Sequence, residues 1–266
     1  MNAPNLWLEM ALTRAELYGK GIFTTIAVTS GNLALWPSHW RRLTANADRI
    51  GLDISSHTES EVRNSALDAV ASAAIVDGRV RVTFADLTPS ELWAADGVGG
   101  QATALSFAAA GPRSVPEPFR LTVSPYPINS GSPLSGVKSC NYLEQIISLD
   151  EARGRGFHEA VRLNERGLVT SACMASIFWE RGGRLYTPSL STGCLAGTTR
   201  EFILANVKCI ETEARIDELL AAEAVYLTSA GLGVVVANVM NEREIGSGQF
   251  NLRGLWPPAE DADQQG

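Results

Sequence analysis

Lysine is scarce in this chain, and one lysine stands where its type could do chemistry. The 266 residues contain only three lysines, Lys20, Lys138 and Lys208. Lys138 follows a loop rich in Gly, Ser and Pro and precedes an amphipathic segment. A lysine amine attacks carbonyl groups when burial or a neighbouring cation lowers its pKa. Lys138 is therefore a candidate for Schiff-base chemistry, and a solvated surface lysine is the alternative interpretation.

Two further segments could bind an anion. Gly197, Thr198 and Thr199 precede a predicted helix, so their backbone N–H groups and hydroxyls would point towards a ligand at the positive end of the helix dipole. Thr228 and Ser229 follow a predicted strand, where a turn could do the same. An ordinary N-cap is the alternative for the first segment, because Thr and Ser cap many helices.

A fixed cation could come from the segment HWRRL. Arg42 follows His39 by three residues, which places both side chains on one face of a helix. Such an arginine would supply positive charge to an anion site. A solvated arginine is again the alternative.

The elements that would position these residues form two groups. In the first 110 residues, β-rich or alternating segments predict strands at 21–31, 33–36, 79–85 and 102–110. Helical periodicity predicts helices at 38–52 and 59–74. Three prolines in 111–118 indicate a linker between domains. We therefore predict an α/β (α+β) protein whose first domain spans residues 1–110, with a linker at 111–120.

The second domain is predicted at 121–254. Strands are expected at 119–126, 158–164, 167–173 and 176–188, the last a hairpin around Gly182 and Gly183. Helices are expected at 141–156, near Thr198 and near Ile216. The apolar stretch 224–240 is short and contains polar residues, so it predicts buried strands rather than a membrane span. Residues 255–266 are expected to be disordered.

Composition excludes several classes of protein. A formal net charge of -7 and a pI near 5.1 leave no basic excess for nucleic acid. Four scattered cysteines without a C-x-x-C pair favour reduced thiols in a cytoplasm. Three histidines lie too far apart in the chain to suggest a metal site. The first residues lack the order of a secretory signal, so we expect a soluble protein with no membrane partner.

Six motifs in order resemble the fold-type IV pyridoxal-phosphate enzymes. They are GKGIFTTIAV from Gly19, H-x-x-R-L from His39, K-x-x-N-Y-L from Lys138, GLVTSACMASIF from Gly167, Y-T-P from Tyr186 and L-x-G-x-x-R from Leu195. This family includes branched-chain and D-amino-acid aminotransferases and aminodeoxychorismate lyase. F-T-T at 23–25, L-E-Q after the lysine, V-T-x-x-C-x-A and F-W at 178–179 are most similar to the lyase subgroup.

The resemblance implies roles for particular residues. Lys138 would form the Schiff base with pyridoxal 5'-phosphate and move the proton at the substrate α-carbon, with Thr25 beside it as a second catalytic residue. Thr24 and Thr25 would line the substrate side of the pocket. The other implied cofactor-binding residues are Arg42, Tyr142, Ser171, Thr198, Thr199 and Ser229. The resemblance further implies two α/β domains with the cofactor between them, a homodimer, and the conversion of 4-amino-4-deoxychorismate to 4-aminobenzoate and pyruvate in folate synthesis.

The chain departs from the family pattern at one position. Ser171 stands where the family has a glutamate that pairs with the pyridine nitrogen, and Ser176 replaces a nearby asparagine. A carboxylate keeps that nitrogen protonated and makes the ring a deep electron sink, which transamination needs. A serine is tolerable for β-elimination, in which electrons leave with the β-substituent. Ser171 thus favours a lyase over a branched-chain or D-amino-acid aminotransferase, and a non-catalytic family member remains a further alternative.

Overall fold

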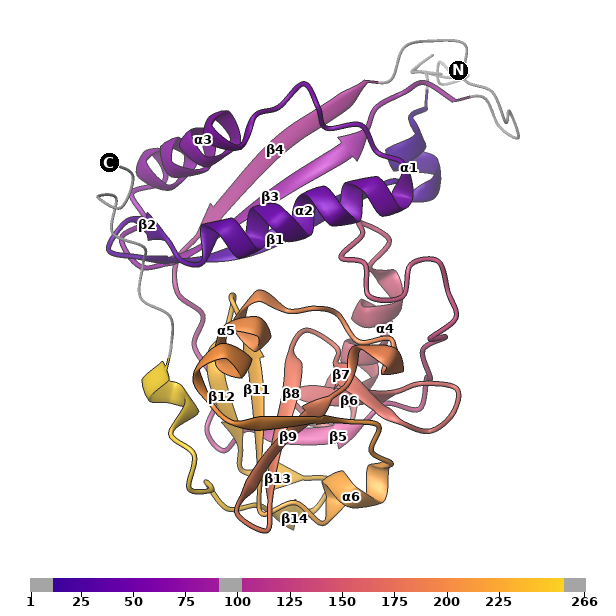
Figure 1. Cartoon of the computed structure of the whole chain (residues 1–266), viewed down its shortest axis with the longest axis vertical. Helices are drawn as coiled ribbons and strands as arrows, with labels where there is room; N and C mark the ends of the chain where they lie inside the picture. The colour runs from indigo at the N-terminus through magenta and orange to yellow at the C-terminus, as the bar shows by residue number, and fades with distance from the viewer. Residues whose placement is uncertain (1–11, 91–101, 256–266) are drawn as a thin grey trace, which may run out of the picture.

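The computed structural model describes residues 12–90 and 102–255. The described strands form one four-stranded sheet and two five-stranded sheets. Figure 1 shows the four-stranded sheet with its helices in one half of the molecule and the other two sheets in the second half. The mixed α/β fold expected from the sequence is confirmed. The start of the chain and nearly all of the tail expected to be disordered lie outside the described residues.

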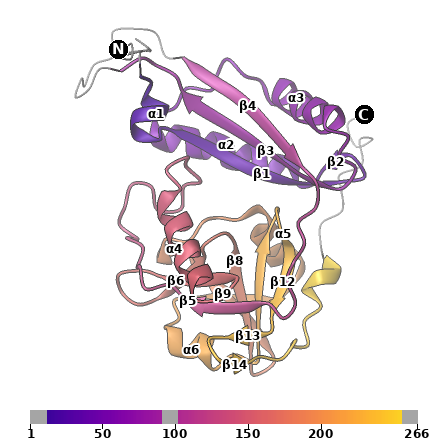
Figure 2. The same cartoon turned by 180° about the vertical axis from the view of Figure 1, so that it is seen from behind.

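The first half is an antiparallel sheet covered by helices on one face. The strand order is β2-β1-β3-β4, and helices α2 and α3 lie on the same side of the sheet in both views (Figures 1 and 2). The elements are α1 (Arg14–Tyr18), β1 (Gly21–Thr29), β2 (Asn32–Leu33), α2 (Trp36–Ile50), α3 (Glu59–Ser72), β3 (Gly78–Asp86) and β4 (Thr103–Ala110).

The start of α2 corrects one prediction. Residues 33–36 were expected to form a strand, but β2 ends at Leu33 and the helix begins at Trp36. Leu35 has a left-handed φ of 55° and Pro37 lies in the first helical turn. Because proline has no backbone N–H and a fixed φ, it suits the first turn of a helix and not a paired strand. The helix therefore begins two residues earlier than predicted.

Strand β1 separates the helix-covered face of the sheet from the opposite face. Ile22 and Ile26 belong to the apolar cluster with Leu43 of α2. Successive side chains of a strand point to opposite faces, so Phe23 and Thr25 point away from the helices. Thr25 pairs in register with Arg81 of β3, which places both side chains on that second face.

The second half contains two sheets with orders β10-β9-β8-β11-β12 and β14-β13-β5-β6-β7. Its strands are β5 (Arg120–Val123), β6 (Glu159–Leu163), β7 (Val169–Ala172), β8 (Ser176–Arg181), β9 (Arg184–Pro188), β10 (Cys209–Thr212), β11 (Ala224–Ser229), β12 (Gly233–Ala237), β13 (Val239–Met240) and β14 (Arg243–Glu244). Its helices are α4 (Leu143–Gly154), η1 (Leu190–Thr192), α5 (Thr198–Asn206), α6 (Ile216–Leu220) and η2 (Leu252–Leu255). The predicted linker contains no helix or strand until Arg120, which begins β5.

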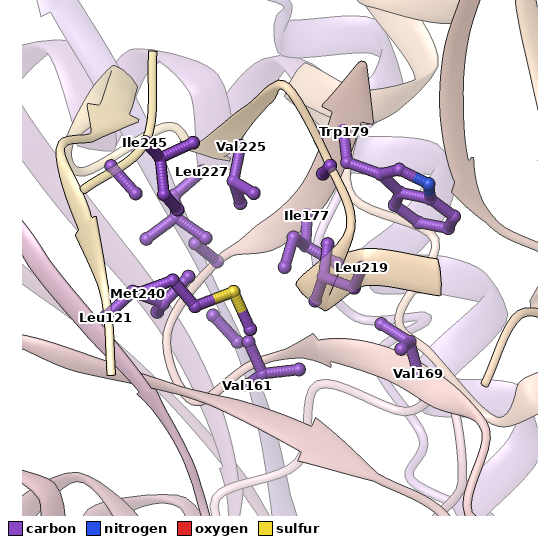
Figure 3. Close-up of a cluster of buried hydrophobic side chains, with 14 of the residues drawn as sticks. Leu121, Val161, Val169, Ile177, Trp179, Leu219, Val225, Leu227, Met240 and Ile245 are labelled. Carbon is purple, nitrogen blue, oxygen red and sulfur yellow. The ribbon is translucent and has the colours of Figure 1, made fainter. Parts of the chain in front are cut away.

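The two sheets of the second half enclose an apolar core. Leu121 and Val161 extend from one sheet towards Ile177 and Leu227 of the other, and Met240 fills the space beside them (Figure 3). All five side chains are almost completely inaccessible to solvent. Burial of this apolar area is the main contribution to stability in this half.

Several local predictions are confirmed. The hairpin of β8 and β9 turns at Gly182 and Gly183, whose φ values of 56° and 68° require residues that tolerate the left-handed region. The apolar stretch 224–240 forms β11, β12 and β13 rather than a helix. Within residues 12–90 and 102–255, no helix has the length and hydropathy needed to span a membrane.

Helix α4 was located correctly, but its apolar periodicity does not describe a buried face. Leu149 is buried, whereas Leu143, Ile146 and Ile147 are exposed by 64%, 38% and 48%. The apolar spacing that predicted the helix therefore comes partly from residues that face outward in the single chain.

Candidate active site

A cavity of about 700 Å³ lies between the two halves of the molecule. Its wall includes Phe23 and Thr25 from the first sheet, and residues from α4, α5 and the loops at the strand ends of the second half. All residues predicted to belong to the site except Thr24 line this cavity: Thr25, Arg42, Lys138, Tyr142, Ser171, Thr198, Thr199 and Ser229. Tertiary structure thus brings together positions that are spread over about 200 residues of sequence.

Lys138 is fixed against the edge of the first sheet. The Lys138 carbonyl accepts a hydrogen bond from Phe23 N (3.0 Å), and Cys140 N donates to Gly21 O (2.8 Å). Its Nζ lies beside two aromatic rings that contact each other, 4.5 Å from the ring centroid of Phe23 and 4.9 Å from that of Tyr142. These contacts place the amine in the cavity rather than in bulk solvent.

The surroundings of Lys138 favour its neutral amine. Burial, followed by the positive charges of Arg42 and Arg81, lowers its pKa from 10.5 to about 7. An amine with such a pKa is neutral in a large fraction of molecules near neutral pH, so it is available as a nucleophile or a base. Nζ donates a long hydrogen bond of 3.4 Å to the Tyr142 hydroxyl. Burial raises the pKa of Tyr142 to about 12, so this phenol stays protonated.

One end of the cavity carries hydroxyl groups without partners. Helix α5 begins after Gly197, whose N-cap position provides no side-chain hydrogen bond. The hydroxyls of Thr199 and Thr228 are buried and have no hydrogen-bond partner among the described residues. A buried polar group without a partner is costly, so this arrangement fits a ligand that accepts several hydrogen bonds. A phosphate group at a helix N-terminus has that property.

Arg42 supplies a cation at the same end. Its Nη2 donates to Thr24 Oγ1 (2.7 Å) and its Nη1 to the Ala196 carbonyl (3.3 Å). Its Nε is buried and finds no partner in the described part of the chain. Burial lowers the pKa of Arg42 to about 10, and the guanidinium therefore remains charged at neutral pH.

Thr24 does not lie where we expected it. Its side chain is fully buried on the helix-covered face of β1, and it hydrogen-bonds to Arg42 and His39 instead of lining the cavity. The alternation of side chains along a strand explains the difference, because adjacent residues cannot face the same side. Only Thr25 faces the cavity.

Ser171 has a neighbour that the sequence did not indicate. It pairs in register with Arg162 of β6, which also lines the cavity and is only 1% exposed. Arg162 forms an ion pair with Glu144 and donates through Nε to the Tyr126 carbonyl (3.2 Å), but no hydrogen-bond partner for Nη1 occurs in the part of the chain that is described. The sequence signal that could have identified Arg162 is its charge, at a position inside the strand predicted at 158–164.

Arg79 and Arg81 were also missed. Both line the cavity, from alternate positions of β3. The Arg81 guanidinium lies 3.5 Å from the ring centroid of Phe23, and its Nε donates to Thr83 Oγ1 (3.0 Å). The R-V-R pattern of a predicted strand could have shown that both arginines share one face.

The described ranges, 12–90 and 102–255, contain no group of three or more His, Cys, Asp or Glu side chains suited to a metal ion. The cavity instead combines an amine of low pKa, a cluster of hydroxyls at a helix N-terminus and several arginines. These features define an α/β protein whose cavity places a lysine of lowered pKa near buried, unpartnered hydroxyls and arginines.

The chain belongs to the amino-transferase class IV family, whose model matches residues 21–238. This is a family of fold-type IV pyridoxal-phosphate enzymes. An aminodeoxychorismate lyase of Bacillus subtilis is 33% identical over 116 residues, which are 42% of this chain and 40% of that protein. A branched-chain aminotransferase of Thermoproteus uzoniensis has a TM-score of 0.83 at 26% identity, with 92% of this chain and 86% of that chain covered. A 4-amino-4-deoxychorismate lyase of Pseudomonas aeruginosa shares the fold, with a TM-score of 0.78 at 22% identity and coverage of 96% and 94%.

Proposed function

We propose that this protein is a pyridoxal-phosphate-dependent lyase that converts 4-amino-4-deoxychorismate to 4-aminobenzoate and pyruvate. Two sets of residues support binding of the cofactor. The unpartnered hydroxyls of Thr199 and Thr228, with Arg42, fit its phosphate. The amine of Lys138, with its pKa near 7, fits its aldehyde. When bound, pyridoxal phosphate supplies an electron sink that labilises the proton on the carbon bearing the substrate amine.

The observation that carries the choice of reaction is the pairing of Ser171 with Arg162. Where the family pattern has a glutamate, this chain has Ser171, and the Ser171 hydroxyl lies beside the buried guanidinium of Arg162. The guanidinium is paired with Glu144, and its free Nη1 is a donor that cannot accept a proton from a nearby ring nitrogen, whereas a carboxylate at position 171 would accept one. Transamination needs the protonated ring more than elimination does. The absence of a carboxylate from position 171 therefore supports a lyase.

The arginines of β3 support a substrate with two negative charges. Arg79 and Arg81 face the cavity from the first sheet, whereas the unpartnered hydroxyls of Thr199 and Thr228 belong to the second half. 4-Amino-4-deoxychorismate carries one carboxylate on its ring and one on its enolpyruvyl group. Arginine binds carboxylates through paired, charge-assisted hydrogen bonds. A branched-chain amino acid would offer only one carboxylate and an aliphatic side chain to the same wall.

Lys138 performs the proton transfer in this proposal. Its neutral Nζ takes the proton from the ring carbon that carries the amino group, and the electron pair left behind becomes part of the aromatic ring. The C–O bond on the adjacent carbon breaks, and the departing enolpyruvate gains a proton to give pyruvate. No oxidant or reductant is needed. Arg79 and Arg81 hold the substrate carboxylates during this elimination.

The test combines a spectrum with a product assay. Protein supplied with pyridoxal phosphate should show a long-wavelength absorption band that borohydride abolishes, and should release pyruvate from 4-amino-4-deoxychorismate. Lys138→Ala should lose the band and about 10³- to 10⁴-fold of the activity. Lys208→Ala is the matched control, because Lys208 is exposed and does not line the cavity.

Two results would contradict the proposal. Transfer of an amino group to a keto acid without pyruvate release from 4-amino-4-deoxychorismate would identify an aminotransferase. Absence of the band in the parent protein would reject the cofactor and favour a non-catalytic role.

We further propose that the protein is a homodimer. The exposed residues Leu143, Ile146 and Ile147 form an apolar surface on α4, and Ile146 also lines the cavity. A second copy covering this surface would bury apolar area and close the mouth of the cavity. Sedimentation should give a dimer for the parent and for Leu190→Glu, which alters an exposed residue elsewhere, and a monomer for Leu143→Glu with Ile147→Glu. A monomeric parent would contradict this part of the proposal.

A further inference from the structure

A chain of hydrogen bonds runs behind the cavity wall from Arg42 to Thr198. Arg42 Nη2 lies 2.7 Å from Thr24 Oγ1, and Thr24 Oγ1 lies 2.6 Å from His39 Nδ1. His39 Nε2 lies 3.2 Å from Thr198 Oγ1. Thr24, His39 and Thr198 are all buried. Of these residues, Arg42 and Thr198 also line the cavity. The series of hydrogen bonds therefore connects two candidate anion-binding groups of the cavity through the protein interior.

The direction of this chain follows from donors and acceptors. Arginine only donates, so Thr24 Oγ1 accepts from Arg42. The Thr24 hydroxyl is fully buried, and among the described residues the only acceptor within reach of its proton is His39 Nδ1. Thr24 therefore donates to Nδ1. The opposite arrangement would leave the Thr24 proton buried without a partner, which is unfavourable.

His39 must then carry its single proton on Nε2. Its imidazole is almost completely buried, and burial followed by the charges of Arg42 and Lys138 lowers its pKa well below 6.5. The ring is therefore neutral. Because Nδ1 accepts from Thr24, Nε2 holds the proton and donates to Thr198 Oγ1. The proton of the Thr198 hydroxyl has no other acceptor in the described part of the chain, so it is free to point into the cavity.

We propose that His39 is a positioning residue, which orients the Thr198 hydroxyl so that it donates to an anion at the N-terminus of α5. The same series of hydrogen bonds holds Arg42 through Thr24. One buried imidazole thus positions both the Arg42 cation and the Thr198 hydroxyl donor. The inference rests on the proposed function only in that the anion is the cofactor phosphate. The site then prefers a ligand group that accepts hydrogen bonds without donating them.

The first test is independent of any ligand. The chain has three histidines, His39, His57 and His158, so nitrogen NMR of protein labelled at histidine can be assigned with His39→Phe. His39 should be the neutral Nε2–H tautomer and should remain neutral between pH 6.5 and 8, because its pKa lies well below 6.5. A proton on Nδ1, or a charged imidazole in this range, would overturn the proposal even if the protein proves to be a lyase.

The second test uses inorganic phosphate and cofactor-free protein in calorimetry. His39→Phe and Thr24→Val should each weaken phosphate binding about tenfold, which corresponds to the loss of one charge-assisted donor. Thr24→Ser keeps the hydroxyl and should bind within twofold of the parent. Attachment of pyridoxal, which lacks the phosphate, should be unchanged in all variants, whereas a general structural defect would weaken both ligands.

If His39→Phe and Thr24→Val bind phosphate as tightly as the parent, the proposed positioning role of His39 is overturned and the lyase proposal is left intact. A parent protein that binds neither phosphate nor pyridoxal phosphate would overturn both. If His39→Phe does not fold, Thr24→Val and Thr24→Ser, together with the tautomer of the parent, decide the question.

Discussion

The two faces of β1 show how one strand serves both the fold and the site. On the helix-covered face, Ile22 and Ile26 pack in the apolar cluster under α2. On the other face, Phe23 and Thr25 line the cavity beside Arg81. The residues alternate along a single strand, so stability and binding are separated by direction and not by distance in the sequence.

The faces differ in whether their buried polar groups have hydrogen-bond partners. Thr24 is the polar residue on the helix-covered face, and its hydroxyl has two partners. On the cavity side, the Thr199 and Thr228 hydroxyls, Arg42 Nε and Arg162 Nη1 are buried with no partner among the described residues. A fold tolerates such groups where a ligand completes their hydrogen bonds. Unpaired donors are thus concentrated at the cavity wall, although Asn46 Nδ2 and Arg120 Nε are also buried without a partner away from it. The following changes test that distinction.

The largest effect is expected from the helix-covered face. Ile26→Ala should lower the free energy of unfolding by about 3 kcal/mol, because it leaves a cavity in the apolar cluster. Thr25→Ala, the adjacent residue on the other face, should change stability by less than about 1 kcal/mol. Urea unfolding measures both. Equal losses in the two variants would remove the distinction between the faces.

Lys138 should destabilise the cofactor-free protein. Its pKa is about 7 in the folded state and near 10.5 when unfolded, so the unfolded chain binds more protons between these values and stability rises with pH there. Lys138→Met should thus be more stable than the parent by about 2 kcal/mol at pH 7, after a discount for the partial exposure of this side chain.

The gain from Lys138→Met should shrink as the pH rises towards 10.5. Urea unfolding at pH 7 and pH 10 measures it, with Lys208→Met as the control on an exposed lysine. No gain at pH 7 would show that the amine is not held in an unfavourable environment.

Arg81→Leu tests the substrate side of the cavity. Loss of one carboxylate contact should raise KM for 4-amino-4-deoxychorismate about tenfold, with a smaller change in kcat. Arg81 is also one of the cations that lower the pKa of Lys138, so the acidic limb of the pH–rate profile should move to higher pH. Arg181→Leu, at an exposed arginine, should behave like the parent. An unchanged KM would place the carboxylates elsewhere.

The smallest effect is expected at Thr199. Because its hydroxyl has no partner among the described residues, Thr199→Val should leave the free energy of unfolding of the cofactor-free protein within about 0.5 kcal/mol. The same change should weaken phosphate binding roughly fivefold, as one donor is lost. Thr187→Val should do the reverse, because Thr187 Oγ1 donates to the Ile177 carbonyl (2.8 Å) inside the protein. Matching results for the two variants would contradict the role of unpaired donors.

The sequence located the residues whose signals are local. Helix α5 begins at the predicted Thr198, because a glycine and two hydroxyl residues stand before a helical pattern. Lys138 could be singled out because lysine is rare here and because a loop and a helix meet at that position. Alternation and turn glycines likewise identified β3 and the hairpin at Gly182 and Gly183. Each of these signals depends on residues within a few positions of one another.

Only the tertiary structure decided which residues meet. Arg162 lies beside Ser171 because the antiparallel pairing of β6 and β7 sets these two residues opposite each other, and Arg42 reaches Thr24 because α2 packs on β1. The apolar spacing of α4 could not show that Ile147 stays exposed, because periodicity gives a face and not its partner. The sequence by itself thus determined most of the elements, and the amine, the hydroxyls and Arg42 of the site, but not Arg79, Arg81 and Arg162. Their electrostatic environment was decided by long-range packing, since burial and neighbouring charge set a pKa and neither is encoded locally.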